Sequence, residues 1–289
     1  MIGSAVALSL GSRGNEIFKL VRREPVSNNE IRWDIGQNIL SSDTIEGLDA
    51  VIHFAGENIG EGRWTKKKKE RILESRIKGT RLLSENLAGL KRPPKVFITA
   101  SAVGFYGDRG GTFLTEHSSR GEGFLPEVCV QWEKAAEKAI KAGIRVVNTR
   151  FGIVLASEAK LLKIQKKIFR LYLGGIIGSG NQYISWISIE DLKRALLFIL
   201  NHSEISGPVN LVSPNPITNR EFTRIFARTL RRPAVFRIPA FAVKAVFSEK
   251  GVEMILSSTR VFPEKLLKAG FDFQYENLHK ALKKALILD

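Results

Sequence analysis

The spacing of apolar positions predicts a regular alternation of strands and helices over the first half of the chain. Short apolar runs that end near glycine are typical of buried parallel strands, whereas apolar positions three or four residues apart indicate amphipathic helices. The order of these elements predicts successive β-α-β units, and therefore a parallel sheet with right-handed crossovers. The predicted elements are helices at 2–10, 66–90 and 125–142, and strands at 16–21, 49–54, 95–100 and 144–149.

The rhythm changes after residue 150. A predicted helix at 158–173 is followed by a glycine-rich loop at 174–180, and no strand follows at once. A helix at 189–201 and a strand at 208–212 then return the chain to the sheet. The remaining segment, 218–289, has a helical pattern that three prolines interrupt.

Composition narrows the class of protein. The chain has 289 residues, 44% of them hydrophobic, and a single cysteine, Cys129, which excludes an internal disulfide and a paired-thiolate zinc site. The four histidines are far apart in the sequence, so no metal site is expected. No run of eighteen apolar residues and no leader pattern is present. We therefore expect a cytoplasmic protein with no membrane partner.

The net charge of +16 is compatible with nucleic acid, an anionic membrane surface or a phosphate-rich small ligand. The distribution of the charge helps to choose among these partners, because the lysines at 66–69, 163–167 and 283–284 are scattered over predicted helix surfaces. Solvated helix faces explain such lysines, so a basic nucleic-acid-binding protein is kept only as an alternative.

Three segments, taken in order, carry a family resemblance: His53 to Asn58 (HFAGEN), Ser101 to Asp108 (SAVGFYGD), and Gly178 to Ile187 (GSGNQYISWI). Together with the carboxyl-terminal segments IPAF and GFDF, they resemble the atypical extended short-chain dehydrogenases called NAD-dependent epimerase family proteins. The resemblance implies a doubly wound α/β fold of the Rossmann type with a smaller, mainly helical substrate lobe. We expect an NADP-binding lobe at 1–155, with return segments at about 185–212, and the substrate lobe at 156–184 and 213–289.

The resemblance also shows a departure at the amino terminus. In this fold the first strand ends in a glycine-rich turn whose amides receive the cofactor pyrophosphate. Here the chain begins Met1-Ile2-Gly3, so Gly3 matches only the last glycine of that turn. We expect a sheet that lacks its first strand, and the hypothesis is that the chain is shortened relative to the functional protein.

The implied cofactor is NADP, with NAD less favoured. Arg22 and Arg23 follow the second strand of the fold, where a carboxylate would suit NAD, and guanidinium groups suit a 2′-phosphate instead. Ordinary surface charge is the other interpretation of these arginines. The remaining candidate cofactor residues lie at strand ends or on the following helix: Gly3, Phe54, Ala55, Gly56, Arg76 and Val154.

The usual catalytic pair of the superfamily, a tyrosine with a lysine four residues later, is absent. Val128 and Trp132 stand near those positions, and neither can transfer a proton. Ser101 matches the superfamily's catalytic serine, and Tyr106 or Glu133 could supply a proton. Each of the three is equally explained as a loop or helix residue.

Ser179, Gln182 and Trp186 are the candidate substrate residues, because a glycine loop and an aromatic wall suit a small polar ligand. Core packing explains Trp186 equally well. Ser188 stands where the family commonly has histidine. The substrates of the family are therefore not carried over to this chain. The leading hypothesis is an NADP-dependent oxidoreductase or nucleotide-sugar-epimerase-like enzyme acting on a small molecule, and the alternative is a non-catalytic NADP-binding regulator.

Overall fold

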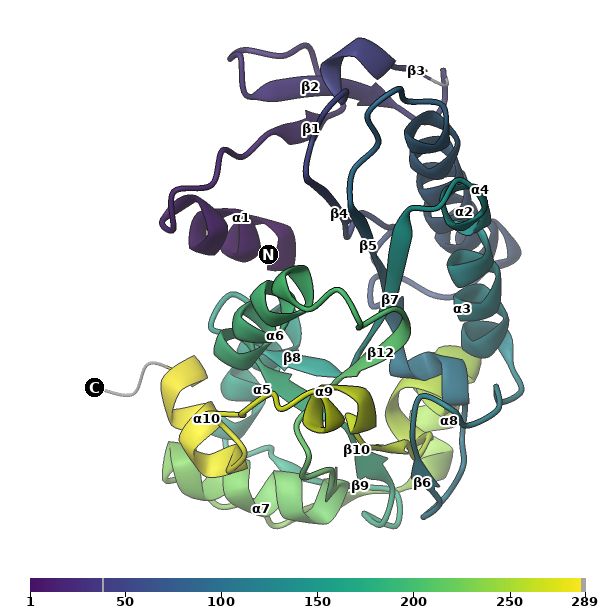
Figure 1. Ribbon diagram of the computed structural model, residues 1–289. Coiled ribbons are helices and arrows are strands. Elements are labelled where there is room, and N and C mark those ends of the chain that lie inside the picture. The colour runs from purple at the N-terminus through teal and green to yellow at the C-terminus, as the bar shows by residue number, and fades with distance from the viewer. Residues whose placement is uncertain (38, 287–289) are drawn as a thin grey trace.

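A four-stranded parallel sheet forms the centre of the computed structural model, which describes residues 1–37 and 39–286 (Figure 1). Its strands run in the order β12-β7-β5-β4, and each neighbouring pair is parallel. Read from β4, this is the order of these strands in the chain, and because neighbouring strands are parallel, helices cross between them as the sequence predicted. The bounds are β4 Ala50–His53, β5 Val96–Ala102, β7 Arg145–Phe151 and β12 Gly207–Leu211.

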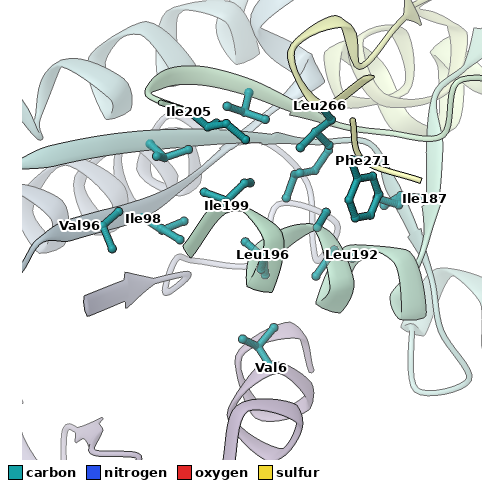
Figure 2. Close-up of a cluster of buried hydrophobic side chains, with 14 of the residues drawn as sticks. Val6, Val96, Ile98, Ile187, Leu192, Leu196, Ile199, Ile205, Leu266 and Phe271 are labelled. Atoms are coloured by element: carbon teal, nitrogen blue, oxygen red, sulfur yellow. The ribbon is translucent and has the colours of Figure 1, made fainter. Parts of the chain in front are cut away.

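Helices cover both faces of this sheet (Figure 1). On one face α2 (Lys66–Ala88) and α4 (Glu137–Lys141) enclose a core that includes Leu83 and Phe97. On the other face α1 (Ile2–Gly11) packs through Val6 on α6 (Ile189–Asn201), which in turn covers the strands (Figure 2). Apolar residues on both faces of β5 and β7 explain why these strands form continuous buried runs.

The sheet is interrupted beside β4. Strands β1 (Lys19–Val21), β2 (Glu30–Asp34) and β3 (Ile39–Leu40) form a separate three-stranded sheet, in which β1 is parallel to β2. No ladder joins β1 to β4 within the described residues. A doubly wound sheet places its first strand between these two positions. The predicted fold, with that strand missing, is therefore confirmed, although β2 and β3 were not predicted.

The carboxyl-terminal region is built around a second core that includes Trp186, Phe226 and Leu282. Its main helices are α5 (Lys160–Arg170), α7 (Asn219–Leu230), α8 (Ala240–Gly251), α9 (Glu264–Lys268) and α10 (Leu278–Leu286), with α3 (Phe124–Lys134) at its border. Short two-stranded ladders connect them: β8 (Ile153–Leu155) with β11 (Trp186–Ser188), β9 (Gly175–Ile177) with β14 (Phe236–Ile238), β10 (Tyr183–Ile184) with β13 (Ile217–Thr218), and β6 (Phe113–Leu114) with β15 (Arg260–Val261).

Several helices were predicted to be longer than they are in the structure. The predicted helix at 125–142 is divided into α3 and α4, because the backbone of Ala136 leaves the helical conformation between them. The helix predicted at 158–173 ends at Arg170, where Tyr172 adopts a left-handed backbone with φ 62°. Short strands β14 and β15 interrupt the helices predicted after residue 218, and residues 287–289 lie outside the described residues.

None of the helices in the described part of the chain combines the length and the apolar character needed to cross a bilayer.

Candidate functional site

The candidate site lies where β4, β5 and β7 end. Carboxyl ends of parallel strands meet at one edge of a sheet, and ligands of doubly wound folds bind outside that edge. Ala55 and Gly56 follow β4, Ser101 lies near the end of β5, and Arg150 lies near the end of β7. Ser101 and Arg150 are direct neighbours in the parallel ladder.

Arg76 is a buried cation beside Gly56. Its guanidinium donates from Nη1 to the carbonyl oxygens of Glu57 at 3.1 Å and Ile72 at 3.0 Å, and its centre is 4.9 Å from the Trp132 ring. No described carboxylate lies within ion-pair distance of it, and burial lowers its pKa below the ordinary arginine value. A cation held by carbonyls in this way still has charge available for an anion.

Gly56 provides close access to that cation. A Cβ atom at Gly56 would stand 3.2 Å from the Arg76 Cζ atom, which is tighter than ordinary contact. Any larger residue there would press on the guanidinium, so the absence of a side chain lets Arg76 lie directly against the segment that follows β4. The structure thus brings together two of the predicted cofactor residues.

The two predicted 2′-phosphate arginines differ in their contacts. Arg23 donates from Nη2 and Nη1 to the Glu30 carboxylate at 2.6 and 2.8 Å, and the pKa of Glu30 is lowered mainly by that hydrogen bond. Arg22 is exposed and makes no ion pair with any described residue. Arg22 is therefore free for an anion, whereas Arg23 would first have to leave Glu30.

The other predicted cofactor residues are spread around the same edge. Phe54 packs edge to face against Phe151, with ring centroids 5.3 Å apart, and Val154 in β8 pairs with Ile187 of β11. Ala55 is partly buried in the α2-side core. Gly3 lies in the first turn of α1, with open space where a Cβ atom would stand. The structure does not join Gly3 or Val154 to Arg76 by any contact.

The three predicted catalytic residues belong to one buried network that is held by Arg150. Arg150 donates from Nε and Nη2 to the two carboxylate oxygens of Glu133, each at 2.8 Å, and Ser101 Oγ donates to Glu133 Oε1 at 2.7 Å. Burial disfavours the charged guanidinium, but the hydrogen bonds and charge of Glu133 outweigh it, so the pKa of Arg150 is raised. The centre of the guanidinium lies 3.4 Å from that of the Phe105 ring.

Tyr106 extends the network to the edge strand β12, where Asn210 pairs with Arg150 in the ladder. Its hydroxyl accepts from Arg150 Nη1 at 3.0 Å and donates to Asn210 Oδ1 at 2.7 Å. The ring is fully buried, and burial raises the pKa of the phenol above its usual value. Sequence reasoning missed Arg150 and Asn210, although an arginine near the end of a predicted buried strand was a signal for Arg150.

The positions that resemble the missing tyrosine and lysine pair are part of the core. Val128 and Trp132 are buried on α3, and the indole N–H of Trp132 donates to Thr80 at 2.9 Å. Cys129 between them is also buried, and burial raises the pKa of its thiol to about 12. None of these three groups can exchange a proton with a ligand at neutral pH.

The predicted substrate residues make contacts within the carboxyl-terminal region. Trp186 is fully buried and donates its indole N–H to the carbonyl of Asn215 at 3.0 Å. The amide of Gln182 donates to the carbonyl of Ile177 at 3.0 Å, and Ser179 is exposed in the glycine loop. Of these three predicted residues, Ser179 leaves the most surface accessible to a ligand.

The parallel sheet, the helices on both faces and the glycine and arginine at its carboxyl edge define a doubly wound α/β protein of the Rossmann type. The family model "NAD dependent epimerase/dehydratase family" matches residues 1–211, and a model described as a domain of unknown function matches residues 238–285. The chain belongs to the NAD-dependent epimerase/dehydratase family. The resemblance predicted from the sequence is thus confirmed.

Named relatives match nearly the whole chain. Epimerase family protein ML0860 of Mycobacterium leprae is 41% identical over 285 residues, which cover 99% of this chain and 92% of the relative. Epimerase family protein SAR0825 of Staphylococcus aureus is 33% identical over 288 residues, which cover 98% and 95%.

Solved structures agree with the fold. Human epimerase family protein SDR39U1 (isoform 2), crystallised with NADPH, superposes with a TM-score of 0.88 at 31% identity and covers 99% of this chain and 96% of its own. A nucleoside-diphosphate sugar epimerase of Corynebacterium glutamicum gives a TM-score of 0.81 at 35% identity, with 99% of this chain covered and 56% of that one.

Proposed function

We propose that the chain binds NADP at the carboxyl edge of its parallel sheet and acts as an oxidoreductase or epimerase-like enzyme on a small polar substrate. The observation that carries this proposal is the buried, carboxylate-free guanidinium of Arg76 beside Gly56. Burying a cation without a carboxylate costs free energy, which a bound phosphate would recover. The NADPH in the similar human structure supports the same cofactor class.

The residues at this edge fit part of such a cofactor. Arg76 would contact a phosphate, and the exposed Arg22 would contact a 2′-phosphate at the end of β1. The strand and the glycine turn that would hold the pyrophosphate are not among the described residues. When bound, the dinucleotide would supply hydride transfer at its nicotinamide ring.

On the protein side, Glu133 is the proposed proton acceptor. Ser101 already donates its hydroxyl proton toward Glu133 Oε1, so a substrate hydroxyl that donates to Ser101 Oγ would pass its proton along the same line. Arg150 holds the carboxylate in position through both oxygens. This arrangement would take the place of the missing tyrosine and lysine pair.

The alternative is a non-catalytic NADP-binding regulator, and the burial of the network favours it. Ser101 is 2% exposed and Tyr106 is 0% exposed, so neither hydroxyl presents surface to a substrate unless neighbouring residues move. Under this alternative, the hydrogen bonds of the network only fasten α3 to the sheet.

Titration of the chain with NADPH tests cofactor binding. We expect Arg76→Met to weaken binding at least about tenfold, because a charge-assisted hydrogen bond contributes about 1.5–3 kcal/mol. The matched control is Arg81→Met, which removes an exposed arginine from the same helix. Equal affinities for the two variants would refute the role of Arg76. Arg22→Ala should weaken NADPH about tenfold while leaving NADH unchanged.

The same titration should include a chain extended ahead of Met1 by an apolar strand that ends in a glycine-rich turn. Backbone amides at such a turn should tighten NADPH binding severalfold. The extended chain is also the better sample for substrate-dependent NADPH oxidation. Loss of oxidation in Ser101→Ala with unchanged NADPH affinity would support the enzyme, and absence of oxidation across small polar alcohols and ketones would support the regulator.

A further inference from the structure

Two segments of the carboxyl-terminal region carry positive charge without any acidic residue. Residues 159–189 contain five lysines and arginines, residues 222–248 contain six, and neither segment contains aspartate or glutamate. Of the twenty large apolar side chains that are exposed among the described residues, twelve also lie in these two segments. Exposed apolar groups and cations are thus concentrated in the same part of the molecule.

Helix α5 presents an apolar row to solvent. Leu161, Ile164, Ile168 and Leu171 are 47%, 48%, 39% and 58% exposed, and their spacing of three, four and three residues places them on one side of the helix. The buried face of α5 is a different one, formed by Leu162 and Phe169. The exposed row is therefore not the core-facing side of an ordinary amphipathic helix.

Cations border this apolar row. Lys163, Lys167 and Arg170 are exposed, and none of them forms an ion pair with a described residue. At 100° per residue they lie on one flank of the row, next to Lys160, which reaches Glu61 at 2.6 Å. The helix therefore has an exposed apolar strip beside a strip of free positive charge.

The turn after α5 continues the same surface. Leu171, Tyr172 and Leu173 are all more than half exposed, and Tyr172 has a left-handed backbone with φ 62°. The Arg232 guanidinium lies 5.2 Å from the Tyr172 ring centroid. The exposed Phe236 packs against Gly175, which follows this turn closely. We call the exposed side chains of residues 160–173 the 160–173 face.

We propose that the 160–173 face binds the surface of an anionic lipid bilayer, with α5 lying in the plane of the headgroups. An interfacial helix of this kind buries its apolar side chains at the acyl boundary while lysine and arginine contact anionic headgroups. The observed features match: the apolar side chains protrude, Lys163, Lys167 and Arg170 form no ion pair with a described residue, and acidic residues are absent from the segment.

The positive charge and the apolar row of the 160–173 face together favour an anionic bilayer over a second copy of the chain or nucleic acid. A second copy of the chain would bring like charges together on an acid-free segment. Nucleic acid would use the cations but would leave the apolar row exposed. The proposal revises the sequence-based expectation of no membrane partner, because a helix that lies on a bilayer needs no spanning segment. It is independent of the proposed cofactor site.

Co-sedimentation with vesicles tests the proposal. We expect the chain to bind vesicles of phosphatidylcholine mixed equally with phosphatidylglycerol, and not vesicles of phosphatidylcholine alone. Ile164→Ser with Ile168→Ser, and separately Lys163→Glu with Lys167→Glu, should each reduce binding about tenfold or more. All four positions are exposed, so the variants should keep the melting temperature and the NADPH affinity of the native chain.

Matched controls make the same kinds of substitution at exposed positions outside the 160–173 face. Val26→Ser with Ile140→Ser removes two exposed apolar side chains, and Lys134→Glu with Lys138→Glu reverses two exposed charges. Both controls should bind the anionic vesicles within about twofold of the native chain. Equal loss in the controls, binding unaffected by the serine pair, or a dimer in solution that the serine pair dissociates would each overturn the proposal.

Discussion

Two buried arginines at the same edge of the sheet are held in opposite ways. Arg150 forms a two-pronged ion pair with Glu133 and also contacts Tyr106, so its charge is fully compensated within the protein. Arg76 has only backbone carbonyls and an aromatic ring, and no described carboxylate pairs with it. The difference indicates that Arg150 serves the structure around it, whereas Arg76 has charge left for a ligand.

The largest effect should follow from removal of Arg150. Arg150→Leu leaves the Glu133 carboxylate without its cation. The Glu133 side chain is only 14% exposed, so water cannot fully replace that cation. Breaking a buried pair from one side should lower the free energy of unfolding by about 3–5 kcal/mol. Urea unfolding followed by far-ultraviolet circular dichroism measures this change.

The double variant Arg150→Leu with Glu133→Leu provides the control, since it removes both charges and should recover most of the lost stability. Some loss should remain, because Ser101 and Tyr106 each keep a hydroxyl that has lost a partner. A single variant as stable as the native chain would show that the pair is not the organising contact of this edge.

His53 extends the comparison, because it is a buried ionisable group that forms no ion pair with any described residue. Its Nε2 atom has no hydrogen-bond partner among the described residues, its ring lies 5.3 Å from that of Trp33, and burial lowers its pKa from 6.5 to about 4. The unfolded chain therefore takes up a proton between pH 6.5 and 4 that the folded chain does not. Stability should fall by up to about 3 kcal/mol as the pH is lowered through that range, and should be unaffected by His53 above it.

Urea unfolding at pH 7.5 and at pH near 4, compared between the native chain and His53→Leu, measures this contribution. The variant should show a smaller loss of stability on acidification, and the difference between the two chains isolates His53 from other titrating groups. Glu116, whose pKa burial raises, acts in the opposite direction and is common to both chains. Identical pH dependence in the two chains would show that His53 is not buried neutral.

The fold was predictable where periodicity and burial agree. The strand ends after His53 and near Ser101 lie in apolar runs, and the sequence located both correctly. Strand β2 was missed although Ile31 and Trp33 alternate with polar residues, because a five-residue segment between turns gives little periodic signal. The break between α3 and α4 was missed because Ala135 and Ala136 are good helix formers, and tertiary packing overrides that propensity.

The candidate site was predictable only in pieces. Sequence motifs indicated Ser101, Tyr106 and Glu133 separately, but Tyr106 is joined to the other two only through Arg150 among the described contacts, and its hydroxyl is also held by Asn210 of another strand. The hydrogen bond from Tyr106 to Asn210 spans 104 positions of the chain. Such a contact arises from the order of strands in the sheet, which local patterns do not specify.

The smallest effect on stability should follow from removal of Arg76, and this is where the two arginines should differ most clearly. Arg76→Met removes a cation whose pKa burial lowers, together with two hydrogen bonds to carbonyl oxygens and the contact with Trp132. Relief of the buried charge offsets the lost contacts, so the free energy of unfolding should change by less than about 1 kcal/mol. In excess NADPH, the same variant should lose about 1.4 kcal/mol or more of the stabilisation that the cofactor gives to the native chain, because this stabilisation depends on the logarithm of the affinity and each tenfold loss removes that amount. Thermal unfolding with and without NADPH separates the two effects in one experiment. A loss of several kcal/mol without ligand would place Arg76 in the same structural role as Arg150, and the proposed cofactor contact would then lose its main support.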